Sequence, residues 1–202
     1  AGSDTIDGGG GTDWLIGGAG DDIYVVGSTA EIVSEAAGNG TDTVWVTAGT
    51  SYTLRANVEA LVLQGSELVS GAGNALGNTI IGNAGNNAMW GLEGADTLSG
   101  GSGNDVLVGG AGRDVLIGGD GADQFRFVAV TDSTVAAPDH VIDFVGGQIA
   151  GLPTYTLAGE LAMGTVLRGN VPRPSFTQEL RRTAPPRWDG EAAFSLLVAE
   201  QH

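Results

Sequence analysis

The sequence predicts an all-β protein: a parallel β-roll, or β-solenoid, built from nonapeptide repeats and followed by a poorly defined C-terminal tail. The first observation is a nine-residue phrase, Gly-Gly-x-Gly-x-Asp-x-U-x with U a large apolar residue, which runs in register over residues 73–126. The second is that two further copies lie at residues 8–25. A repeated phrase of this kind is a sequence signature of a solenoid.

Each repeat divides into a turn and a strand. The glycines suit a tight turn that visits positive φ, and the last three residues alternate as a short strand does. The U side chains should therefore face one side and form the core: Leu15, Tyr24, Ile80, Met89, Leu98, Leu107, Leu116 and Phe125. Two nonapeptides make one coil, so each turn is expected to stack on the turn eighteen residues later.

This stacking predicts a column of aspartates on each edge of the solenoid. Asp96 pairs with Asp114 on one edge, and Asp105 pairs with Asp123 on the other. Carboxylates in adjacent coils, about 4.8 Å apart, repel each other. A hard divalent cation would reverse that repulsion, and Ca²⁺ fits better than Mg²⁺ because it accepts six or more oxygen ligands in flexible geometry. The fold should depend on several calcium ions.

Composition narrows the function. The chain has 24 acidic and 8 basic residues, a formal charge of −16 and no lysine, which argues against nucleic acid as a partner. It has no cysteine and no apolar run of the roughly 20 residues that a membrane helix needs. Its only histidines are His140 and His202, and no serine-nucleophile or phosphate-loop phrase occurs, so we expect no catalysis by this chain. We expect it to be monomeric.

Five segments follow from the pattern. We expect β-roll coils at residues 1–26, a solenoid spacer at 27–72, a second β-roll at 73–127, a cap at 128–148 and a divergent or disordered tail at 149–202. The chain starts within a repeat, which predicts a fragment of a longer protein and pairs Asp4 with Asp22.

The spacer is expected to continue the solenoid through short strands at residues 43–47, 52–54 and 58–63. Leu61 and Leu63 should face one way and Val62 the other. The spacer contains no ligand phrase. Asp42 either binds an ion or, as we favour, forms an Asx turn.

Two turns carry asparagine instead of aspartate. Asn78 and Asn87 occupy the aspartate position of their repeats, and Asn brings a carbonyl oxygen but no charge. These turns are either structural, which we favour, or calcium sites. In the tail, a shifted reading frame and an export signal at residues 191–198 both remain open.

The repeats resemble the RTX (hemolysin-type) calcium-binding repeats of bacterial secreted proteins, and residues 125–148 resemble the C-terminal domain of serralysin-type metallopeptidases. The resemblance implies that calcium is bound by the aspartate and by the carbonyls of the second and fourth template positions. In the repeat at residues 91–99, Leu92 stands at the second position, so only Gly94 matches the template there. Asp132 and Asp139 either close the last sites or are turn and cap residues. The residues carried over are Asp4, Gly9, Gly11, Asp13, Gly18, Gly20, Asp22, Gly94, Asp96, Gly101, Gly103, Asp105, Gly110, Gly112, Asp114, Gly119, Gly121 and Asp123.

The same resemblance implies export through a type I secretion exporter, and a module that is unfolded in the calcium-poor cytosol and folds outside the cell. The function indicated is calcium binding by an extracellular folding and secretion module. The alternative is the C-terminal part of a secreted serralysin-like zinc metallopeptidase whose catalytic domain is absent from this chain.

Overall fold

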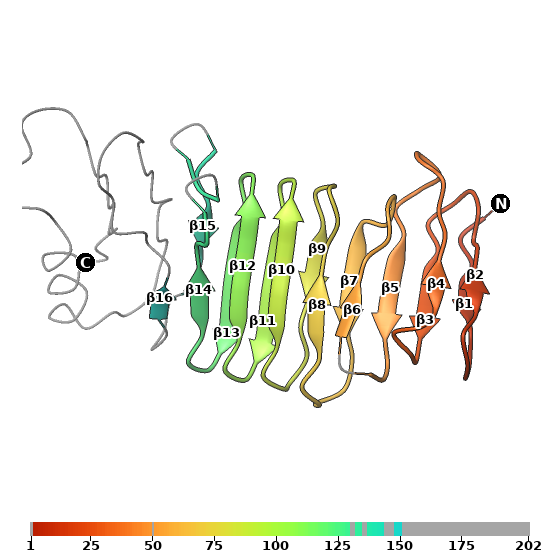
Figure 1. Ribbon diagram of the computed structural model, residues 1–202, viewed down its shortest axis with the longest axis horizontal. Helices are drawn as coiled ribbons and strands as arrows, with labels where there is room; N and C mark the ends of the chain where they lie inside the picture. Colours follow the sequence, from red (N-terminus) through yellow and green to blue (C-terminus); the bar gives the residue numbers. More distant parts are fainter. Residues whose placement is uncertain (1, 50, 130–131, 135–136, 144–147, 151–202) are drawn as a thin grey trace, which may run out of the picture.

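Two parallel sheets face each other in the computed structural model, and the chain winds between them in successive coils (Figure 1). The structure describes residues 2–49, 51–129, 132–134, 137–143 and 148–150. The predicted all-β parallel solenoid is confirmed. The tail predicted from residue 149 lies almost wholly outside the described residues.

The larger sheet has 8 strands, and each pairs in parallel with the strand one coil away in the order β1-β3-β5-β7-β9-β11-β13-β15. Their bounds are β1 Thr5–Asp7, β3 Ile23–Val26, β5 Thr43–Val46, β7 Ala60–Leu63, β9 Thr79–Ile81, β11 Thr97–Ser102, β13 Val115–Asp120 and β15 His140–Val141.

The facing sheet has 6 strands in the order β16-β14-β12-β10-β8-β6, and β2 and β4 form a separate 2-stranded sheet. Their bounds are β2 Trp14–Leu15, β4 Ile32–Val33, β6 Ser51–Thr53, β8 Ser70–Ala72, β10 Ala88–Glu93, β12 Val106–Ala111, β14 Gln124–Arg126 and β16 Gln148–Ala150. Strand β16 crosses the predicted boundary between cap and tail.

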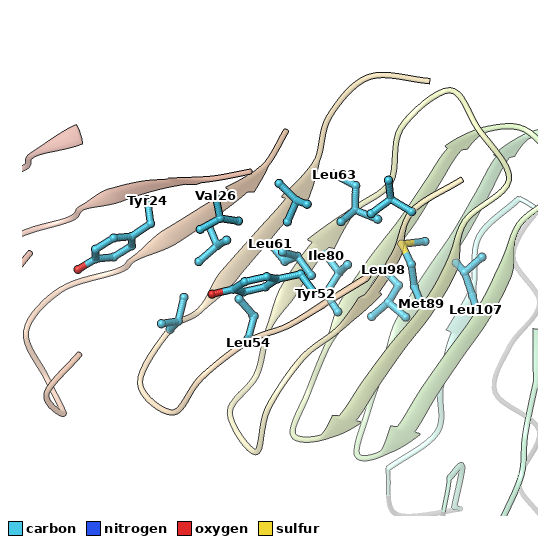
Figure 2. Packing of buried hydrophobic residues seen from close by; sticks show 14 of the residues in the cluster. Tyr24, Val26, Tyr52, Leu54, Leu61, Leu63, Ile80, Met89, Leu98 and Leu107 are labelled. Carbon is cyan, nitrogen blue, oxygen red and sulfur yellow. The ribbon is translucent and has the colours of Figure 1, made fainter. Parts of the chain in front are cut away.

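The core is a double file of side chains between the sheets, one row from each sheet. All eight U side chains are buried, with at most 4% of their surface exposed. Tyr24, Ile80, Leu98 and Leu107 lie along this file, from the first repeat block to the second (Figure 2). The register supports the eighteen-residue coil, because Leu98 lies beside Leu116. In the repeat blocks one alternating apolar residue per repeat thus supplies the core, and spacer residues such as Val44 and Leu61 continue it.

The spacer continues the solenoid as expected, with coils of unequal length. Leu61 and Leu63 are buried at 0% and 2% exposure, whereas Val62 is only partly buried. Strand β5 pairs with β3 on one side and with β7 on the other. The described residues contain no helix, and so none that could cross a bilayer.

Candidate metal centre

The first glycine of each repeat makes room for the aspartate five residues later. A Cβ on Gly100, Gly109 or Gly118 would collide with the Oδ2 atom of the aspartate in the same turn. The aspartate side chain therefore folds back over its own turn. Any larger residue at the first position would displace the carboxylate.

The second and fourth glycines have a different role, which is conformational. Every glycine predicted as a carbonyl ligand has positive φ, for example 101° at Gly110 and 142° at Gly121. In the second repeat block, side chains here would also strike the previous coil, since a Cβ on Gly112 would collide with the Gly94 carbonyl oxygen. Leu92 keeps the same turn with φ of 83°, although it has a side chain. The carbonyls of these positions consequently point from one turn toward the next.

The aspartates form a hydrogen-bonded ladder along each edge. The Asp96 N–H donates to Oδ1 of Asp114 at 2.9 Å, across 18 residues. On the other edge the Asp105 N–H donates to Oδ1 of Asp123 at 3.0 Å. The predicted pairing of these aspartates is confirmed. At the N-terminal end the predicted pair is also present, because the Asp4 N–H donates to Oδ1 of Asp22 at 2.7 Å.

The second carboxylate oxygen of these aspartates has no protein partner. Asp96, Asp105 and Asp114 are at most 1% exposed, and the Oδ2 atom of each is buried without a hydrogen bond. The same is true of the Oδ2 atoms of Asp13 and Asp22. A buried carboxylate oxygen without a partner is costly unless a cation binds it. Hard, oxygen-only donor sets of this kind fit Ca²⁺.

Burial also makes ionisation of these groups unfavourable. It raises the pKa of Asp96 from 3.8 to about 7, and the Asp114 carboxylate adds to the effect. Burial raises the pKa of Asp105 and of Asp114 to about 6, with smaller contributions from Asp123 and Asp132 respectively. Protons and a divalent cation would therefore compete for the same oxygens.

The side-chain amides of the two asparagine turns have hydrogen-bond partners within the protein. Asn87 donates from Nδ2 to the Val69 carbonyl at 2.8 Å, and its Oδ1 accepts the Asn83 N–H at 2.8 Å. Asn78 makes equivalent bonds with the coil before it and with its own turn. Both side-chain atoms thus have protein partners, unlike the carboxylates above. This favours the structural interpretation of these two turns.

The ladder extends further than the sequence predicted. Asp42 accepts the Asp22 N–H at 2.9 Å across 20 residues, so its interpretation as an Asx turn is wrong. Glu59 in turn accepts the Asp42 N–H at 2.8 Å across 17 residues. Neither residue could be predicted from a fixed eighteen-residue spacing, because the coils of the spacer differ in length. Only the short strands that follow them could have indicated their place.

The two aspartates left open at the C-terminal end have different surroundings. Asp139 occupies the ladder position, since its Oδ1 accepts the Asp114 N–H at 2.9 Å across 25 residues, and its Oδ2 is buried without a partner. Burial raises the pKa of Asp139 to about 8, and Asp114 adds to the shift. Asp132 instead accepts the N–H groups of Val128 and Ala129. Asp132 is therefore a turn residue, and Asp139 continues the column.

A second column begins on the opposite edge, where Asp13 and Glu31 lie over Gly8. A Cβ on Gly8 would lie 2.9 Å from Oε1 of Glu31 and 3.3 Å from the Asp13 side chain. Glu31 is 1% exposed, and its Oε2 accepts the Gly27 N–H at 2.7 Å while its Oε1 is buried without a partner. Glu31 was not recognised from the sequence because a glutamate does not match the template.

Stacked glycine turns that hold buried, unpartnered carboxylates define the molecule as a cation-binding β-solenoid. The family model for the RTX calcium-binding nonapeptide repeat (4 copies) matches residues 1–28, 72–107 and 99–127. Residues 1–28 and 72–127 therefore contain RTX-type nonapeptide repeats, and repeats of this kind bind Ca²⁺, several ions to an array. The repeat region is a structural calcium-binding module and is not catalytic.

The comparisons leave the other resemblance unsupported. The family match ends at residue 127, so the serralysin-like nature of residues 128–148 stays a prediction. A comparison with curated proteins gave no match.

Proposed function

We propose that this chain is the calcium-dependent folding module of an extracellular protein exported through a type I secretion system. Residues 1–26 and 73–127 would be the calcium-binding blocks, joined by the spacer at 27–72 and closed by the cap at 128–148. The proposed ligands in each block are the aspartates of the ladder and the carbonyls of the positive-φ glycines.

One observation carries the proposal: the buried Oδ2 atoms of Asp96, Asp105 and Asp114 have no protein partner. They lie in columns where each carboxylate is one coil from the next. Bound calcium would supply positive charge and vacant coordination positions to these oxygens. The protein contributes the turn shape, through glycines at the first, second and fourth positions.

Charge makes the folding conditional. At a formal charge of −16, the chain repels itself, and the columns add buried carboxylates to that repulsion. Calcium-poor conditions should thus favour the unfolded chain, and millimolar extracellular calcium the solenoid. The repeat family supports export, because RTX repeat proteins are generally secreted by type I systems. A chain that is unfolded before export is also suited to a one-step exporter.

A calcium titration followed by far-UV circular dichroism tests the proposal, with magnesium in parallel. We expect a coil-to-β transition with a midpoint of about 10⁻⁴–10⁻³ M calcium, as in extracellular modules, and no such transition with magnesium. The double variant Asp105→Asn/Asp114→Asn should bind fewer calcium ions at saturation, because it removes two charged ligands. Asp120→Asn, an exposed carboxylate in the same block, is the charge-matched control. A chain that is already β-rich in excess chelator and ignores calcium would refute the proposal.

A further inference from the structure

Three carboxylates from different coils converge at the junction of the first repeat block and the spacer. One oxygen from each of Asp22, Glu35 and Asp42 lies within 4.8 Å of the other two. We propose that they form an additional calcium site that does not follow the nonapeptide template. Glu35 and Asp42 belong to no repeat, so the site goes beyond the function proposed above, although it shares Asp22 with it.

The chain brings these residues together through its coil geometry. Asp22 precedes β3 and Asp42 precedes β5, the next strand of the same sheet. Glu35 follows β4, in the connection between those two turns. The backbone of this connection is held by the preceding coil, because the Ser34 N–H donates to the Leu15 carbonyl at 2.9 Å.

The Glu35 side chain is anchored as well. Its Oε1 accepts the N–H groups of Gly17 and Gly18, each at 3.3 Å, and also the hydroxyl of Tyr24. Its Oε2 accepts the Ala36 N–H at 3.3 Å and the Asn39 side-chain amide at 3.5 Å. A half-buried carboxylate with five donors is held in one place, unlike a surface glutamate that samples many rotamers.

The Oδ2 atom of Asp22 is a second indication of a bound ligand, independent of the distances between the three carboxylates. Asp22 is 1% exposed, its Oδ1 accepts the Asp4 N–H, and its Oδ2 is buried without a hydrogen bond. A Cβ on Gly17 would collide with that Oδ2 and would lie 2.5 Å from the Tyr24 hydroxyl. Since this hydroxyl donates to Glu35, the unpartnered oxygen of Asp22 is directed into the cluster.

Among the described residues, no basic side chain donates a hydrogen bond to the cluster. The hydrogen-bond donors to these three carboxylates, within the part of the chain that the structure describes, are backbone N–H groups, the Tyr24 hydroxyl and the Asn39 amide. Neutral donors leave three negative charges within reach of one another. A cation is the remaining way to offset their repulsion.

Distances and donor type indicate which cation. Calcium binds oxygens at about 2.3–2.6 Å, so ligands on opposite sides of one ion lie up to about 5 Å apart. Three oxygens within 4.8 Å of one another can therefore share a single ion. The donors are all oxygens, which favours calcium over zinc or copper, and magnesium would require a tighter octahedral arrangement. The ion would join the repeat block to the spacer across the 20-residue coil.

The test is the number of calcium ions bound per folded chain, measured by equilibrium dialysis with Ca²⁺ at saturation. Asp42→Asn keeps the oxygen that accepts the Asp22 N–H and removes the charge. Glu35→Gln removes the charge and keeps Oε1 with its three hydrogen bonds, while its amide group takes the place of Oε2. We expect each variant to bind one ion fewer than the wild type, and the double variant to lose no more than one. Glu67→Gln, an exposed glutamate in the spacer, is the matched control and should bind the full number.

Circular dichroism at saturating calcium checks that each variant is folded, and either single variant suffices for the test. An unchanged number of ions in a folded Glu35→Gln or Asp42→Asn chain would overturn the proposed site. The Asp105→Asn/Asp114→Asn variant separates the two proposals. If it loses ions while the Glu35 and Asp42 variants lose none, only the additional site is wrong.

Discussion

In the absence of calcium, acidification should stabilise the solenoid. The buried carboxylates of Asp96, Asp105 and Asp114 have raised pKa values in the folded chain because burial disfavours their charged form. A group whose pKa is higher in the folded state contributes stability below its unfolded pKa and loses it as pH rises through its folded pKa. Stability is therefore lost as pH rises from the unfolded value of 3.8 to the folded values, about 6 to 7 for these three aspartates.

The size of the effect follows from the shifts. One pKa unit corresponds to about 1.4 kcal/mol, so the rise at Asp105 from 3.8 to about 6 is worth about 3 kcal/mol. The rise at Asp96 to about 7 is worth about 4 kcal/mol. A domain has only about 5–15 kcal/mol of net stability. Ionising two of these aspartates without a cation thus removes a large share of the stability.

Far-UV circular dichroism from pH 4 to 8 in calcium-free buffer measures this directly, because it also reports on a chain that is unfolded. We expect the β content to rise as pH falls from 8 to 4, and Asp105→Asn/Asp114→Asn to flatten the curve. At saturating calcium the dependence should reverse, because protons then displace the metal as pH falls below about 7. β content that does not change with pH in calcium-free buffer, or that increases with pH, would refute the conclusion that the pKa values of these buried carboxylates are raised in the folded chain. Asp120→Asn should leave the curve unchanged.

Three further outcomes are expected. Asn87→Ala removes the amide that donates to the Val69 carbonyl, so stability in urea at saturating calcium should fall by about 1–3 kcal/mol; no change would contradict the role of Asn87 in holding its own turn. Gly112→Ala should abolish the β signal at any calcium concentration, because its Cβ collides with the Gly94 carbonyl, whereas Gly10→Ala meets nothing within 4 Å and should fold normally. Leu107→Ala should cost about 2–5 kcal/mol in saturating calcium, and a smaller loss would mean that the core file repacks.

The repeat blocks were predictable because one short period determines three properties at once. The same nine residues set the turn conformation, the face of the core residue and the place of the carboxylate. The period therefore predicted both that Leu98 lies in the core beside Leu116 and that Asp96 pairs with Asp114. The stacking partner of each turn followed from simple counting along the chain.

The spacer sites were not predictable by counting. Its ladder bonds span 20 residues at Asp42 and 17 at Glu59, because the connections there differ in length. Glu35 belongs to no strand and reaches the Asp22 turn only because the backbone of the preceding coil holds its connection in place. Contacts of that kind depend on the three-dimensional path of the loop, for which the local sequence contains no period.

The repeat thus closes one backbone turn with two different chemistries. Where asparagine occupies the sixth position, as at Asn87, its amide and its oxygen both find backbone partners within the protein. Where aspartate occupies it, as at Asp105, one oxygen receives a backbone N–H and the other is buried with nothing to bind. The turn conformation is common to both, since the glycines and asparagines before the sixth position supply it. The exchange of one atom, an amide nitrogen for a carboxylate oxygen, therefore separates the turns whose side chains are fully hydrogen-bonded within the protein from the turns that need a cation.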